Sequence, residues 1–176
     1  MQVHTARSWA IVCMAVWLTS MVAMAIVATQ NFYTIDRLIK ARPNPAFAAD
    51  VDKLGPDSAR ELMRYLSSEL NRLYFQYANV VQLAVGILAL WLVVKVPEAD
   101  KPKWAIVAML GIVLFLTILV TPFIISVGRS IDFVPRDPPP DGLRTFGLLH
   151  ATYTVFDGVE LILGIIVTLW LVKAKD

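Results

Sequence analysis

The sequence contains few of the residues from which disulfides, metal centres and charged surfaces are built. Its 176 residues include one cysteine and two histidines, and only 17% of the chain is charged. The single cysteine, Cys13, excludes an internal disulfide and a cysteine-based zinc site. The net charge of +2 is too small for a nucleic-acid-binding surface, so we expect no nucleic-acid partner.

Motifs of conventional enzymes are missing as well. The chain has no HExxH pair, no phosphate-binding glycine loop and no nucleophile–histidine motif. The spacing of His150 and Asp157 corresponds to about 10 Å along a helix, which is too far for one metal ion. His4 and His150 are expected at opposite membrane faces, where they cannot share a haem iron. We therefore predict a protein that is not an enzyme and has no catalytic residue, metal or cofactor.

Long apolar runs dominate what is present. Hydrophobic residues make up 57% of the chain, and mean hydropathy is +0.63. Four runs reach the ~20 residues that an α-helix needs to cross the bilayer, and strands could not satisfy their backbone groups there. The sequence predicts an all-α four-helix transmembrane bundle, one integral membrane domain over residues 1–176 with the lipid bilayer as its first partner. The predicted spans are about 8–29, 72–95, 103–127 and 145–172.

The first run has an alternative interpretation as a secretory signal. Arg7 precedes it, and residues 23–25 resemble a cleavage site. The run is longer than the apolar region of about 7–15 residues that is usual in such signals. A membrane span is therefore the preferred interpretation.

The positions of lysine and arginine predict the orientation. One side of the predicted bundle carries a dense basic set close to the helix ends: Arg7, Lys95, Lys101, Lys103, Lys173 and Lys175. The other side has more basic residues in total, but they are dispersed and matched by acids. Because density near the helix ends matters most, we predict that both termini are cytoplasmic, in a bacterial inner membrane.

The segment between the first two spans, residues 30–71, is predicted to be an outer-face loop with an amphipathic helix. Ser58 and Glu61 have the spacing of a capping box, and Pro56 just before them is a suitable place for the chain to enter a helix. Leucines follow on one face, and charged residues occupy the others. This helix should run directly into the second span.

Two pairs of segments resemble each other. Residues 79–87 align without gaps with residues 157–165, and residues 9–12 recur as residues 104–107. We interpret the chain as a duplicated two-helix hairpin with both copies in the same orientation. Chance matching among Leu, Val and Ile is the alternative, most seriously for the shorter pair.

Polar residues in the second and fourth spans form the candidate site. Helical periodicity places them on one face of each span: His150, Tyr153, Asp157 and Glu160 in the fourth, and Asn79 and Gln82 in the second. We expect amide–carboxyl hydrogen bonds between the two helices. Gly86 and Gly164 should let their backbones approach closely.

Three interpretations of this polar face remain open. The amides and acids could hold the two helices together, with at least one carboxyl protonated. Alternatively, Glu160 and Asp157 could bind a cation or relay protons, because ionisable groups at this depth are often functional. A lipid- or quinone-binding module would use Tyr153 with Trp91 and Trp170, although aromatic belts at the interfaces explain the tryptophans more simply.

Residues 146–150, followed by Tyr153, Asp157 and Gly164, resemble the closing helix of the transmembrane protein 205-like family. Residues 59–89 are loosely similar to the segment that leads into the family's second helix. The resemblance implies a four-helix frame and no established enzymatic mechanism. Our preferred interpretation of the whole sequence is a structural or accessory component of a membrane assembly, with other membrane subunits or a homo-oligomer as its possible protein partners. A small transporter or channel subunit using Glu160 and Asp157 is the alternative.

Overall fold

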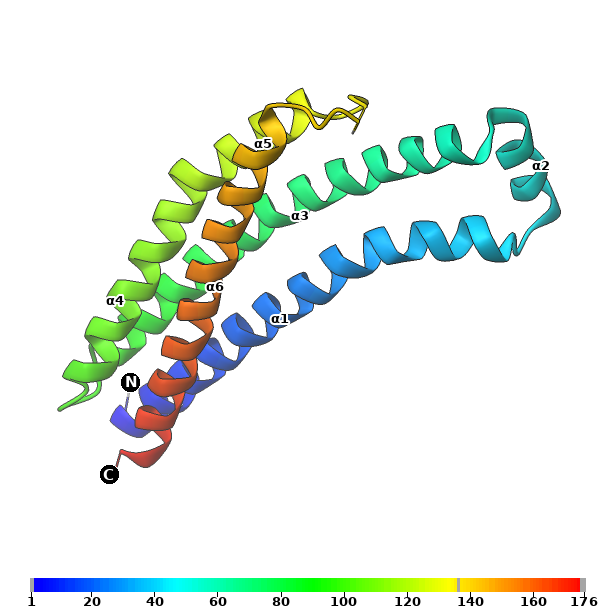
Figure 1. Ribbon diagram of the computed structural model, residues 1–176. Helices are drawn as coiled ribbons and strands as arrows, with labels where there is room; N and C mark the ends of the chain where they lie inside the picture. Colours follow the sequence, from blue (N-terminus) through cyan, green and yellow to red (C-terminus); the bar gives the residue numbers. More distant parts are fainter. Residues whose placement is uncertain (1, 136, 175–176) are drawn as a thin grey trace.

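The computed structural model describes residues 2–135 and 137–174 and is helical almost throughout these ranges (Figure 1). Lys175, which contributed to the predicted orientation, lies outside them. The elements are α1 (Val3–Ala41), α2 (Pro45–Leu54), α3 (Pro56–Val93), α4 (Asp100–Phe115), a π-helical turn (Leu116–Val120), α5 (Thr121–Ser130) and α6 (Gly142–Lys173).

Four helical stretches are long and apolar enough to cross a membrane. They are α1, α3, the stretch Asp100–Ser130 that comprises α4, the π-helical turn and α5, and α6. The prediction of an all-α protein with four membrane-spanning helices is confirmed at this level. The fold is that of an integral membrane protein, since many large apolar side chains on these helices are exposed in the isolated chain.

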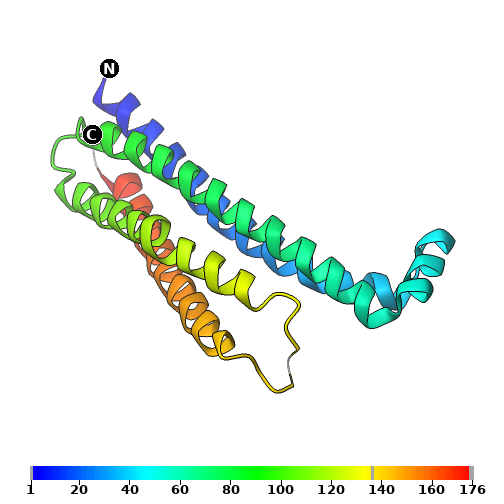
Figure 2. The same cartoon turned by 90° about the horizontal axis from the view of Figure 1, so that it is seen from above.

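The four helices follow one another around the bundle, so that α1 packs against α3 and α6, and α4 packs against α3 and α6. Helices α3 and α6 are therefore diagonal to each other. Both termini lie at one end of the bundle (Figures 1 and 2), which we call the terminal end. There, the Arg7 guanidinium donates a hydrogen bond of 2.5 Å to the carbonyl of Ala174.

At the opposite end, α1 and α3 extend well past the other helices and form with α2 a projecting arm, residues 32–68. Figure 1 shows the arm diverging from α5 and α6. The first predicted span ended near residue 29, but α1 continues to Ala41. No proline or glycine interrupts the chain before Pro43, so nothing in the sequence ends the helix earlier. The predicted loop is thus largely helical.

The start of α3 differs from the capping-box prediction. Gly55, with φ 82°, precedes Pro56 at the first helical position, and Ser58 lies inside the helix. A positive φ is accessible to glycine without strain, and proline is well suited to a helix start because its missing N–H would be unpaired there. Together they turn the chain from α2 into α3 within one residue.

The core lies in the terminal half of the bundle and is apolar, with Met14, Trp17, Ile106, Met109 and Val167 fully buried. It includes side chains from all four membrane-spanning stretches.

The two glycines of the predicted polar face receive side chains of neighbouring helices. A Cβ on Gly86 would lie 2.5 Å from the ring of Trp17, and one on Gly164 would lie 2.5 Å from Leu18. The expectation that these glycines bring the backbones of α3 and α6 together is therefore wrong. Each glycine instead accommodates a residue of α1, because α3 and α6 are diagonal.

Candidate functional site

Asn79 is the centre of a hydrogen-bonded cluster that joins three helical segments. The Tyr153 hydroxyl of α6 donates to Asn79 Oδ1 over 2.9 Å. The Asn79 side-chain amide donates to Thr121 Oγ1 of α5 over 3.1 Å. Thr121 directly follows the π-helical turn and precedes Pro122, whose ring disfavours a regular α-helical turn on its N-terminal side. All three polar side chains are buried and satisfied.

Glu160 occupies a different environment, one turn or more deeper in the bundle. Its side chain is fully buried, and neither carboxyl oxygen has a hydrogen-bond partner of regular geometry among the described residues. The indole N–H of Trp17 faces this carboxyl, and it too has no hydrogen-bond partner of regular geometry in the described part of the chain. Gln82 is buried on α3, yet forms no amide–carboxyl hydrogen bond with it. Among the described residues, the hydrogen bond between α3 and α6 is therefore the one from Tyr153 to Asn79, and the predicted amide–carboxyl bonds are not present.

Asp157 does not share the environment of Glu160. It is half-buried and lines a groove of about 370 Å³ between α1 and α6, together with Thr29 and Gln30. Glu160 lines neither this groove nor the cavity described next. The two acids predicted to act together thus face different surroundings.

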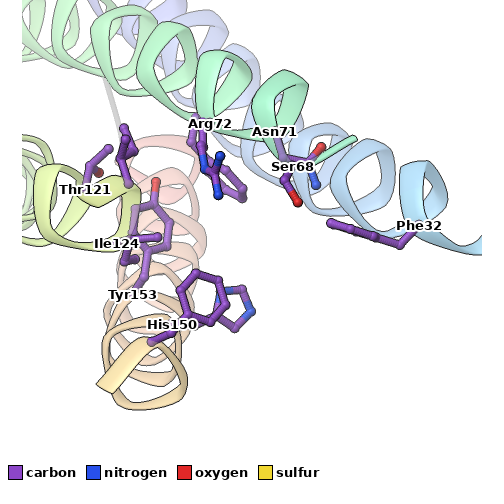
Figure 3. A pocket seen from close by; sticks show the side chains of 11 residues that line it. Phe32, Ser68, Asn71, Arg72, Thr121, Ile124, His150 and Tyr153 are labelled. Carbon is purple, nitrogen blue, oxygen red and sulfur yellow. The ribbon is translucent and has the colours of Figure 1, made fainter. Parts of the chain in front are cut away.

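A cavity of about 120 Å³ lies at the base of the arm, where α1 and α3 diverge from α5 and α6 (Figure 3). Aromatic rings form much of its wall. Phe75 meets Tyr153 edge-on with centroids 5.2 Å apart, and Phe146 stacks on His150 at 6.2 Å. His150 and Tyr153 both line this cavity, with Tyr153 reaching the Asn79 cluster behind it.

Arg72, which lines the cavity, belongs to an ion-pair network of four residues. Arg72, only 9% exposed, bonds to Glu69 on its own helix and to Asp132 beyond α5, at 2.5 and 2.8 Å. Arg129 of α5 contacts both Glu69 oxygens, at 3.0 and 2.8 Å. Gly128 leaves room for the guanidinium, since a Cβ there would lie 3.0 Å from Arg72. The network has no net charge and joins α3 to the end of α5.

This network predicts a pH dependence of stability. Hydrogen bonds from Arg129 first, and then from Arg72, lower the pKa of Glu69 to about 2 from an ordinary 4.5. Because the folded pKa lies below the unfolded one, the contribution to stability is complete above about pH 4.5 and disappears as the pH falls towards 2. Acid titration of the unfolding midpoint should show this loss, and Glu69→Gln should flatten the curve in that window.

Glu61→Gln is the matched control, because Glu61 lies exposed on the same helix and outside the network. Its curve should follow that of the wild type. Equal acid sensitivity in the Glu69 variant would show that the network does not contribute.

The chain matches no protein-family model, no curated protein and no solved structure. Its resemblance to the transmembrane protein 205-like family remains a prediction.

Three residues of this region were not predicted from the sequence. No role was predicted for Trp17 or Thr121, and Arg72 was predicted only as one of the charged residues on the amphipathic helix. The available signals were the Thr–Pro step at residue 121 and the Glu69–Arg72 spacing at the boundary of the second apolar run. Trp91 and Trp170, proposed near a ligand site, lie exposed towards the terminal end, where Lys95 stacks over Trp91.

Proposed function

We propose that this protein is a non-enzymatic membrane component, structural or accessory in a larger assembly, with both termini in the cytoplasm of a bacterial cell. Lys95 over Trp91 and Lys103 beside Trp104 form a basic and aromatic belt near the terminal end. Such a belt is typical of the cytoplasmic interface of an inner-membrane protein. The diagonal positions of α3 and α6, and their two equivalent glycines, agree with a duplicated hairpin.

The observation that carries this proposal is the sealed environment of Glu160. From its level to the terminal end, the interior of the bundle consists of apolar side chains such as Met14, Ile106 and Val167. A proton or cation that crosses a membrane needs polar groups or water along its path. An unpaired charge in such a core would be very unfavourable, so the structural interpretation requires an uncharged Glu160 carboxyl. The packing around Glu160 therefore favours a structural role for this residue over a transport role.

The runner-up function is transport of protons or cations. The groove that contains Asp157 supports it, because this acid is accessible beside Thr29 and Gln30. Four helices seldom enclose a full transport pathway, so the second half of a path would have to come from another copy of the chain.

Substitution of both acids separates the two functions. We expect Glu160→Gln and Asp157→Asn to leave proton and cation flux in liposomes equal to that of the wild type. We also expect Glu160→Gln to change the free energy of unfolding by less than about 1 kcal/mol, because the amide has the shape of an uncharged carboxyl. Flux is read with a pH-sensitive dye, and stability by thermal unfolding in detergent.

Glu61→Gln again serves as the control for removing an acid outside the bundle. A wild-type flux that disappears in Glu160→Gln, while the unfolding midpoint is unchanged, would establish transport and contradict the accessory role. Native mass spectrometry of gently extracted protein tests the assembly directly. Co-release with other polypeptides supports the proposal, and a bare homo-oligomer would favour the runner-up.

A further inference from the structure

We propose that the cavity at the base of the arm binds the head group of a neutral, membrane-soluble compound: a single ring with oxygen acceptors, of the quinone or phenol class, carried on an apolar tail. The cavity is lined by α1, α3, α5 and α6. The proposal goes beyond the accessory role and does not depend on it.

The size and walls of the cavity fit one ring. Its volume is about 120 Å³, and an apolar cavity of about 150 Å³ is known to hold benzene. Phe75 of α3 and Phe146 of α6 line the cavity. Phe32 of α1 lines it as well and is labelled in Figure 3. Flat rings prefer offset or edge-on contacts with such walls. A flat ring would therefore make favourable contacts on more than one side.

The polar groups of the cavity that have no protein partner among the described residues are hydrogen-bond donors, so they fit a ligand that carries a hydrogen-bond acceptor. Asn71, Arg72 and Tyr153 already use their side chains in hydrogen bonds within the protein. The Ser68 hydroxyl and the His150 ring nitrogens have no protein partner in the described part of the chain, and both residues line the cavity. A hydroxyl and an imidazole can each donate one hydrogen bond. A carbonyl or phenolic oxygen on the ring would satisfy them.

The same groups argue against a phospholipid phosphate. The guanidinium of Arg72 is held between Glu69 and Asp132, and the network around it carries no net charge. A phosphate would have to displace a carboxylate from Arg72 to gain a strong ion pair. An uncharged ring can bind while Arg72 keeps its ion pairs with Glu69 and Asp132.

The cavity has an exposed edge between α1 and α6. His150 is exposed at its edge, and Phe32 lies across from it on α1. The neighbouring groove with Asp157 is lined by the same two helices, α1 and α6, and is mostly apolar. An apolar tail attached to the ring would lie between α1 and α6 and continue into lipid.

Equilibrium binding to protein in nanodiscs tests the proposal with three probes: a short-chain benzoquinone, an alkylbenzene of the same length without oxygens, and phosphatidylglycerol. We expect saturable binding of the benzoquinone and binding at least about tenfold weaker for the alkylbenzene, which corresponds to loss of one or two hydrogen bonds. Preference for phosphatidylglycerol, or no saturable benzoquinone binding, would overturn the proposal.

Two variants locate the site. His150→Phe retains a ring beside Phe146 but removes the nitrogens, and Ser68→Phe fills the cavity. Each should weaken benzoquinone binding about tenfold or more. His4→Phe is the matched control, since His4 lies exposed at the terminal end, and its affinity should equal that of the wild type.

Unfolding midpoints of all variants show whether each is folded. Equal affinities in His150→Phe, Ser68→Phe and the wild type would place any binding elsewhere and contradict the proposed site. Flux and assembly, which test the accessory role, are measured separately, so failure of one proposal leaves the other intact.

Discussion

Arg72→Met is expected to lower the free energy of unfolding by about 3 kcal/mol, because removing one partner from a buried ion pair leaves the opposite charge uncompensated. Arg72 is the member of its network that is least exposed, and it is the only one that bonds to Asp132. Methionine replaces much of the side-chain volume without the charge. SDS titration of the purified protein in mixed micelles measures the change.

Arg60→Met provides the comparison. Arg60 also bonds a carboxylate through two nitrogens, at 2.7 and 3.0 Å from Asp36, but both side chains are about half exposed on the arm. Exposed pairs of this kind contribute about 0–1 kcal/mol. Similar losses in the two variants would show that burial does not distinguish the Arg72 network.

Gly86→Ala should be destabilising by about 2 kcal/mol, the typical effect of forcing an extra methyl group into a packed core. The added carbon would lie 2.5 Å from Cη2 and Cζ3 of Trp17 and 2.7 Å from Leu110. Helix propensity alone predicts the opposite sign, since alanine is favoured over glycine by about 1 kcal/mol. Thermal unfolding in detergent therefore tests which effect is larger.

Gly111→Ala is the matched control, because nothing lies within 4 Å of a Cβ at that position on α4. This variant should be as stable as the wild type or slightly more stable. Replacing Trp17 by leucine in the Gly86→Ala background should recover part of the loss, with a coupling of about 1 kcal/mol in the double-mutant cycle. Additive effects would mean that Trp17 does not restrict Gly86.

The membrane-spanning helices were predictable because bilayer thickness fixes the length of an apolar run. The helix ends were not, because the end of an apolar run is different from the end of a helix. Polar residues beyond position 29 continue α1 to Ala41, and the helix ends only where Arg42 adopts a left-handed conformation before Pro43. The helix start at Pro56 was predictable from the proline, but the cap by Ser58 was wrong, because Gly55 and Pro56 already begin the helix two residues earlier.

For the candidate site, the sequence predicts which residues share a face of one helix, but not which helices contact each other. Periodicity places Tyr153 and Glu160 on one face of α6, but it cannot say which helix that face meets. The hydrogen bond from Tyr153 to Asn79 depends on the three-dimensional order of the helices, and so does the position of Trp17 opposite Glu160. The Thr121 contact also depends on a π-helical turn, whose local geometry no hydropathy pattern predicts.

The uninterrupted path of α1 and α3 has a consequence for how the arm is built. Helix α1 contains 39 residues, which corresponds to about 58 Å of continuous helix, roughly twice the thickness of the hydrocarbon layer. Each of these two helices passes from arm to bundle without a break in its helical hydrogen bonding, and both curve where the arm begins (Figure 1). Trp17 on α1 and Gly86 on α3 therefore lie on the same continuous helices as the arm. The arm and the core of the bundle are thus built from the same two helices.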